Sequence, residues 1–275
     1  MSEIATALLV FVLLLAATGL GVWVRPLLPE EHKAHETVQL VQLVIGMLVT
    51  FAALVLGLMT ASAKSSFDTA SNDLRTFAAD LIEFDTTLRQ YGDETAEPRR
   101  LLRAYTAAAI ASTWPGEAAP AGDYPKNIGT RPGSTKLENV RLGELLNTVG
   151  QRLRQLQARD ALQQRALDDG LTQFRRVVDA RWKLIEEAHS SISQPFFKTL
   201  TFWLCVIFLS FGLIAPRNAL ALVTISLGAV SIASAIYVIV DLDSPFSGPI
   251  VISSSPMRDA LEHLLAAPPV LPGDA

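Results

Sequence analysis

Cysteine is nearly absent from this chain of 275 residues, in which Cys205 is the single example. One cysteine cannot form a disulfide within the chain, so no disulfide framework can hold the fold together. Cys205 stands in the middle of an apolar stretch, where burial disfavours the reactive thiolate. We therefore expect it to be a small packing residue.

Positive charge is not in excess either. The formal net charge is -4 at pH 7, and a protein that binds nucleic acid would be expected to carry a basic stripe. Glycine-rich phosphate loops, nucleophile elbows and His-Glu zinc helices are also missing from the sequence. The sequence therefore predicts no nucleic-acid partner, no enzymatic activity and neither a metal nor a cofactor.

Charged side chains are missing from four long apolar stretches. No Asp, Glu, Lys or Arg occurs in residues 4–24, 38–63, 199–215 or 219–240. A helix needs roughly 20 apolar residues to cross a bilayer. Inside lipid the backbone must be helical, because no water is present to satisfy free N–H and C=O groups. The sequence predicts an all-α integral membrane protein with four transmembrane helices, two before and two after a polar insert.

The distribution of Lys and Arg near the ends of these spans predicts the topology. Basic residues are more numerous beside the insert and the C-terminal tail than on the opposite side, and such residues favour the cytoplasm. We expect a multi-pass protein of the bacterial inner membrane with the insert and both termini in the cytoplasm. The expected parts are spans one and two in 1–63, a cytoplasmic helical insert in 64–198, spans three and four in 199–240, and a cytoplasmic C-terminal segment in 241–275.

The insert has the periodicity of a helical bundle. From Phe67 to Tyr91 apolar residues recur alternately three and four positions apart, which is heptad spacing. We call this set the seam. No Gly or Pro interrupts the chain between the second span and Gly92, so we expect one continuous helix, and we expect the insert to run on into span three as well. The seam could pack inside an antiparallel bundle or form a coiled coil with neighbouring subunits.

Small and hydroxyl residues recur at helical spacing along the second span. This set, which we call the stripe, consists of Gly46, Thr50, Ala53, Gly57 and Thr60, followed in register by Lys64. We expect the stripe to lie on the same helix face as the seam. In one interpretation the small residues allow helices to pack closely. In the other, subunits surround an axis and the stripe lines a wet path.

A second candidate site lies where the fourth span ends, in the segment Asp241–Pro249. Carboxylates at the carbonyl end of a helix are unfavourable unless a cation is close. One hypothesis is that Asp241 or Asp243 pairs with Lys64 or Lys198 at the membrane interface. The other is that the acids of several subunits form a ring that attracts cations. The interfacial candidates for either role are Asp68, Lys198, Asp241, Asp243, Ser244 and Ser247.

Three segments resemble a family of bacterial membrane proteins with a bestrophin-like domain. They are ALVLGLMTASAKSSFD at 53–68, RRLLRAYTAAAIASTWP at 99–115 and VDLDSPFSGP at 240–249. The order of two spans, a helical insert and two spans also matches, so the resemblance covers nearly the whole chain. The name of the family implies similarity to bestrophins, which are pentameric, ligand-gated anion channels. The resemblance therefore implies a four-span plan and a channel-like oligomer.

Two functions remain open at this point. In the first, the protein is a homo-oligomer in the lipid bilayer with channel-like architecture, and conducts ions through an axis lined by the second span. In the second, it is a non-conducting scaffold or sensor whose cytoplasmic helical bundle binds an unidentified protein. An exposed apolar patch on the insert would favour the second function.

Overall fold

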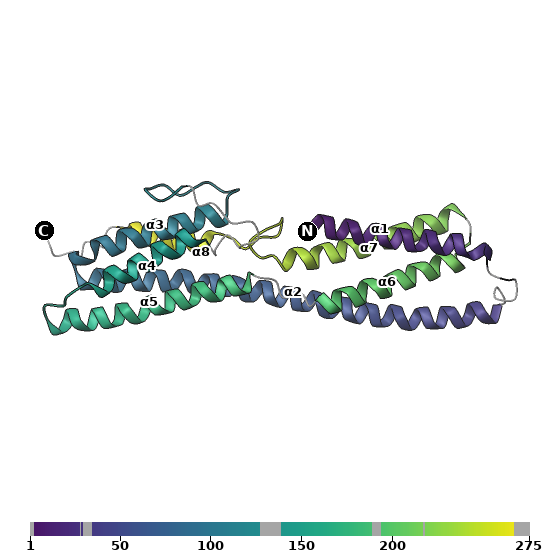
Figure 1. The fold of residues 1–275 in the computed structure, drawn as a ribbon, viewed down its shortest axis with the longest axis horizontal. Coiled ribbons are helices and arrows are strands. Elements are labelled where there is room, and N and C mark those ends of the chain that lie inside the picture. The colour runs from purple at the N-terminus through teal and green to yellow at the C-terminus, as the bar shows by residue number, and fades with distance from the viewer. Residues whose placement is uncertain are drawn as a thin grey trace. The chain divides into compact units, whose positions relative to one another are not determined.

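Figure 1 shows the computed structural model, which describes residues 3–27, 29, 35–126, 139–188, 194–216 and 218–266. Every regular element in these ranges is a helix, and the all-α prediction is confirmed. The chain divides into two compact units. The first, the spanning unit, consists of Met1–Phe67 with Ser190–Ile250; the second, the helical unit, consists of Asp68–His189 with Val251–Ala275.

The spanning unit holds four helices that are long and apolar enough to cross a membrane, which confirms the predicted four spans. They are α1 (Glu3–Val24), the first part of α2 (His35–Tyr91), α6 (Gln194–Ile214) and α7 (Ala219–Leu242). A short 3-10 turn, η1 (Arg25–Leu27), follows α1. The 57 residues of α2 correspond to about 85 Å of helix, nearly three times the thickness of a bilayer core.

Helices α1 and α6 pack against each other through two glycines. Gly21 of α1 lies against the carbonyl oxygen of Leu209, and Gly212 of α6 lies against the carbonyl oxygen of Thr18. A Cβ atom at either glycine would overlap these backbone atoms. Lipid tails are as apolar as the side chains, so helices in a membrane associate largely through close backbone contact and dispersion. The two glycines make that contact possible here.

We expect Gly212→Val to destabilise the spanning unit by about 1–3 kcal/mol, the usual cost of forcing extra atoms into a packed contact. Thermal denaturation of the detergent-solubilised protein would measure the effect. Gly19→Val is the matched control, because a Cβ at Gly19 would meet nothing within 4 Å. Equal stability of the two variants would show that the α1–α6 contact does not need a glycine.

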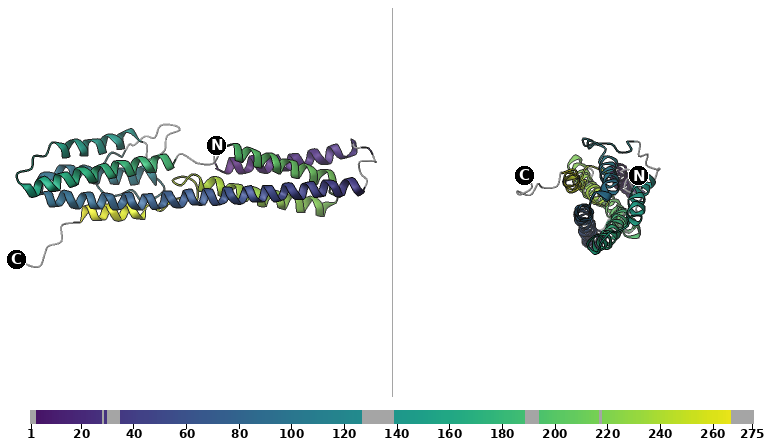
Figure 2. Two further views of the ribbon diagram at one scale, coloured as in Figure 1. Left: turned by 90° about the horizontal axis from the view of Figure 1, so that it is seen from below. Right: turned by 90° about the vertical axis from the view of Figure 1, so that its left-hand side faces the viewer.

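The helical unit is assembled from five helices and a short turn. They are the second part of α2, η3 (Asp93–Thr95), α3 (Ala96–Thr113), α4 (Val140–Arg154), α5 (Ala161–Glu187) and α8 (Ser255–Leu265); two further views are given in Figure 2. The part of the C-terminal segment from Val251 onward belongs to this unit, where the Trp114 indole N–H donates to the carbonyl of Ile252 at 2.7 Å. Residues 189–193, where the insert was expected to run on into span three, lie outside the described residues.

The seam on α2 is buried within the helical unit. Every seam residue from Ala70 to Tyr91 is at most 3% exposed, and the rings of Phe84 and Phe174 lie 5.8 Å apart, centre to centre. The seam therefore packs against α5 and the rest of its own bundle. This leaves it no free surface for a coiled coil with a neighbouring subunit.

Two carboxyl groups meet where α5 ends beside α2. Lys183 Nζ lies 2.8 Å from Asp73 Oδ1. Burial, reinforced by the neighbouring Asp73 carboxyl, raises the pKa of Glu187 to about 7. Glu187 therefore holds its proton at pH values where a free glutamate is ionised.

This raised pKa makes the stability of the protein depend on pH. The protonated form is favoured in the folded state, so its contribution is complete below the ordinary pKa of 4.5 and is lost as the pH rises through about 7. We expect the melting temperature of the native protein to fall relative to that of Glu187→Gln across this interval. Glu186→Gln, at the exposed neighbouring residue, serves as the control. If the melting temperatures of the native protein and Glu187→Gln changed in parallel with pH, the raised pKa of Glu187 would be contradicted.

Candidate functional site

The stripe on α2 is exposed throughout. All six of its residues, Gly46, Thr50, Ala53, Gly57, Thr60 and Lys64, are exposed, and a Cβ at Gly46 or Gly57 would meet nothing within 4 Å. The other helices of the chain therefore do not pack closely on the stripe. If close packing is its role, the partner has to be another molecule.

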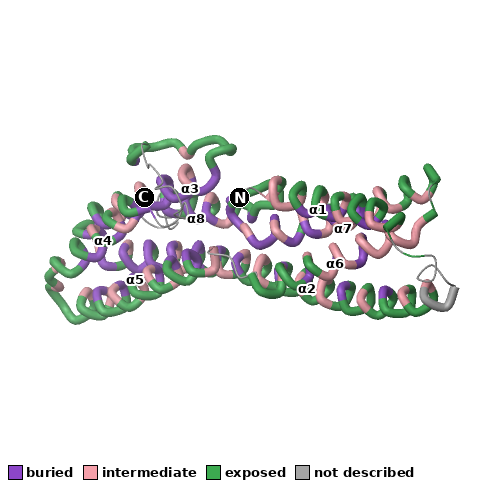
Figure 3. The backbone as a smooth tube through the Cα atoms, turned by 45° about the vertical axis from the view of Figure 1, so that its right-hand side comes forward, coloured by how far each residue is buried: buried purple, intermediate pink, exposed green. Residues whose placement is uncertain are grey.

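The spanning part of α2 is the least covered of the four spans (Figure 3). In its most apolar 18-residue window 11% is buried, against 22–28% in the other spans. Large apolar side chains occupy a second exposed face, including Met47, Leu54 and Leu58. Such side chains are suited to contact with lipid tails. The spanning part of α2 thus has a buried face, a bulky apolar face and the stripe.

The stripe and the seam do not share a face of α2, so that expectation is wrong. The buried residues of the span are Ile45, Ala52 and Ala63, and at about 100° per residue they lie in line with the seam. The stripe lies roughly 100° around the helix from them. A repeat of 3.5 residues drifts by about 20° per heptad on a helix of 3.6 residues per turn. This drift adds up over the four heptads from Gly46 to Leu74. The stripe and the seam therefore lie on different faces of α2.

The threonines of the stripe are satisfied within their own helix. Thr50 Oγ1 donates to the carbonyl of Gly46 at 2.9 Å, and Thr60 Oγ1 donates to the carbonyl of Leu56 at 2.8 Å. Each hydroxyl oxygen keeps lone pairs that can accept a further hydrogen bond. Lys64 closes the stripe, with Nζ 5.6 Å from the centre of the Phe67 ring. The exposed surface therefore offers hydroxyl oxygens along the span and a cation at its end.

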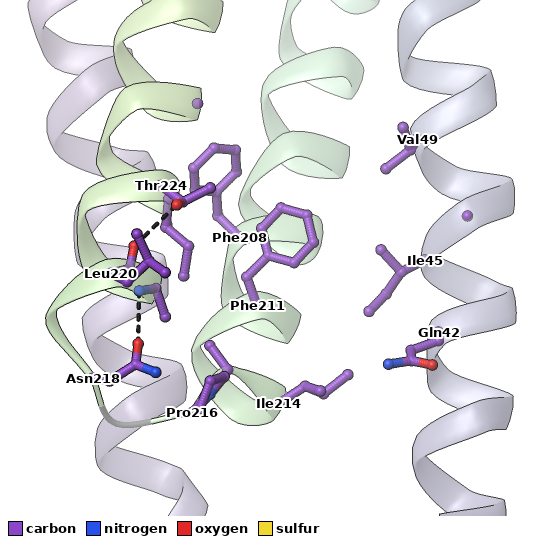
Figure 4. Close-up of a pocket in the computed structure, with 15 residues that line it drawn as sticks. Gln42, Ile45, Val49, Phe208, Phe211, Ile214, Pro216, Asn218, Leu220 and Thr224 are labelled. Carbon is purple, nitrogen blue, oxygen red and sulfur yellow. Dashed lines mark hydrogen bonds between the residues drawn. The ribbon is translucent and has the colours of Figure 1, made fainter.

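A cavity of about 670 Å³ lies between α2, α6 and α7 at the Gly46 end of the stripe (Figure 4). Phe208, Phe211 and Ile45 line it together with other mostly apolar residues. One of its few polar groups already forms a hydrogen bond, since the Asn218 side chain accepts from the N–H of Ala221 at 2.8 Å. The cavity suits an apolar occupant rather than an ion. No sequence pattern pointed to it, because its walls combine α2 with α6 and α7, which come much later in the chain.

The loop after the fourth span folds back onto Asp241. The Asp241 side chain is buried, and its Oδ2 accepts the N–H of Ile250 at 3.0 Å. A Cβ at Gly248 would overlap Oδ1 of this carboxylate, and Gly248 has φ 90. The loop is closed by the N–H of Ser244, which donates to the Asp241 carbonyl at 3.1 Å, and by that of Ser247, which donates to the Ser244 carbonyl at 3.0 Å.

The predicted pairing of Asp241 or Asp243 with Lys64 or Lys198 stays a prediction. At Asp241 the hydrogen bond comes from a backbone N–H, because the prolines turn the chain back over the helix end and bring Ile250 to the carboxylate. Among the described residues Asp241 Oδ1 has no hydrogen-bond partner. Sequence reasoning identified the segment but missed the two residues that complete it, Gly248 and Ile250. Only the glycine could have been found from the sequence, as a candidate for a positive φ.

The remaining interfacial candidates are spread over the spanning and helical units. Asp243 is buried and Ser244 is half-buried, whereas Asp68, Lys198 and Ser247 are exposed. Leu242 packs on Ala63 of α2, so the base of the loop lies beside the Lys64 end of the stripe. In the described parts of the chain no three His, Cys, Asp or Glu side chains gather in a way that could hold a metal ion.

These helices define a multispanning, all-helical membrane protein. The Bestrophin-like domain matches residues 12–257, and the chain belongs to the bestrophin-like family. Solved structures of a bacterial bestrophin homologue from Klebsiella pneumoniae have a similar fold. One is 16% identical with a TM-score of 0.63 over 96% of this chain and 97% of that one; another is 17% identical with a TM-score of 0.59 over 96% and 97%. No curated protein matches the chain.

Gly248→Ala should lower the stability of the protein more than Gly122→Ala does. Both glycines have a positive φ, but a Cβ at Gly122 would meet nothing within 4 Å, whereas one at Gly248 would overlap the Asp241 carboxylate. Backbone strain costs about 1–3 kcal/mol at either position, and only Gly248→Ala adds the overlap. Denaturation of the two variants in detergent would compare them. Equal losses would mean that the contact with Asp241 contributes nothing.

Proposed function

We propose that this protein is a homo-oligomeric ion channel of the bacterial inner membrane, with the stripe of α2 lining its axis. The observation that carries this proposal is the exposure of the stripe, where a Cβ at Gly46 or Gly57 would meet no atom of the described residues within 4 Å. Membership of the bestrophin-like family supports a channel-like architecture. The insert and both termini are placed in the cytoplasm by the positive-inside rule.

The chemistry of α2 supports this orientation. The bulky apolar face fits lipid, and the buried face packs on α6 and α7, so the stripe remains as the surface for other subunits and for the axis. Small residues there leave room for a path, and threonine oxygens can contact partly hydrated ions. Lys64 at the end of the stripe would favour anions over cations electrostatically.

The alternative function, a scaffold or sensor that binds a protein through the helical unit, has less support. The exposed large apolar residues described in that unit are Val140, Leu162, Trp182, Val251 and Leu265. No two of them are neighbours on one helix face, and a docking helix or groove normally uses several adjacent anchors.

Flux through reconstituted liposomes tests the proposal directly. We expect Thr50→Leu to reduce ion flux per folded molecule at least tenfold, because it narrows the path and removes a hydroxyl oxygen. We expect Lys64→Glu to lower the ratio of chloride to potassium permeability. Leu54→Ala, on the bulky apolar face of α2, is the control and should conduct normally.

Two results would overturn the channel proposal. One is a monomeric mass for the detergent-solubilised particle, because a single subunit cannot surround an axis. The other is unchanged conductance and selectivity in both stripe variants.

A further inference from the structure

Two arginines contact one buried carboxylate in the helical unit, and a third arginine lies close by. The Asp85 side chain is 3% exposed, and its two oxygens lie 2.7 Å from Arg89 Nε and 2.8 Å from Arg99 Nε. Arg103 lies one turn after Arg99 on α3 and is close enough for the charges of Asp85, Arg89 and Arg99 to act on it. We call these four residues the arginine cluster.

Arg103 is not neutralised by this arrangement. Its Nε is buried without a hydrogen-bond partner among the described residues. Burial and then the charge of Arg99 lower the pKa of Arg103, and the attraction of Asp85 offsets this in part. Guanidinium groups nevertheless stay protonated in proteins. Asp85 can balance one of the three cations, so the cluster keeps an excess of positive charge.

The cluster is bordered by the end of α8 and a small cavity. The guanidinium of Arg89 donates to the carbonyl of His263 at 2.7 Å and approaches that of Leu264 at 3.4 Å. These carbonyls attract cations only through the helix dipole and supply no full negative charge. The adjoining cavity of about 240 Å³ is lined by Ile82, Asp85, Thr86, Arg89, His263, Leu264 and Ala266.

Pairing with Asp85 does not by itself explain this composition. One arginine would suffice to pair with Asp85, and each further guanidinium adds repulsion in a partly buried place. The planar fork of arginine is, however, well suited to bind the oxygens of a phosphate in pairs. Arg89 and Arg99 keep 20% and 18% of their side chains exposed, so an anion can reach them from solvent.

We propose that the arginine cluster binds a small phosphate-type oxyanion. Asp85 holds the guanidiniums of Arg89 and Arg99 in position, and Arg103 adds a third positive charge to a cluster that contains one carboxylate. The bound anion joins α2 to α3 beside the end of α8. This inference is independent of whether α2 lines a conducting axis.

The test is thermal denaturation of the full-length protein in detergent, with pyrophosphate or inorganic phosphate compared with chloride at equal ionic strength. We expect phosphate anions to raise the melting temperature in a saturable way. Arg103→Gln should abolish this rise, while its melting temperature in chloride stays equal to or above that of the native protein because repulsion is relieved. Arg100→Gln, at an exposed residue of the same helix, should keep the full response.

Line broadening of the phosphorus resonance of inorganic phosphate by the native protein gives a second measurement that needs no variant. Arg103→Lys separates charge from geometry, since it keeps the cation but loses the fork, and it should bind several-fold more weakly. An equal response of native protein and Arg103→Gln, or no saturable response of the native protein, would overturn the proposal.

Discussion

The absence of water from the bilayer core is the constraint on which the rest of this structure depends. Because free N–H and C=O groups would be left unsatisfied there, each apolar stretch is a complete helix. The hydroxyl groups of the spans obey the same rule, and those of Thr50 and Thr60 bond to carbonyls of their own helix. Association between the spans then depends on close contact, which Gly21 and Gly212 permit between α1 and α6.

Helix α2 combines three different environments. Its buried face continues from the spanning part into the seam, its bulky apolar face suits lipid, and its stripe is exposed in the described part of the chain, with open space beside Gly46 and Gly57. In the same chain α1 and α6 use glycines for backbone contact, whereas the glycines of α2 contact nothing. This difference supports a role for the stripe outside the isolated subunit, and an axis shared by several copies is the role we propose.

Two buried carboxylates show how the same group serves different purposes. Asp241 is satisfied in part by the N–H of Ile250 and fixes the loop that follows the fourth span. Asp85 is held by two guanidiniums in a region with surplus positive charge. Asp241 therefore organises backbone, while Asp85 holds the guanidiniums of Arg89 and Arg99 in position.

The sequence alone determined the four spans and the all-α class, because a long apolar run without charged residues is stable in lipid as a helix. It also determined the family, through segments such as 240–249 that the family match includes. It did not determine the partner of Asp241, which depends on how the loop turns back. It also did not determine that the stripe and the seam lie on different faces of α2, because this depends on a small angular drift that adds up over several turns. The glycine contact of α1 with α6, the cavity beside Gly46 and the arginine cluster were likewise decided by tertiary structure. Each of them joins side chains or backbone from different helices, and no local pattern records such a meeting.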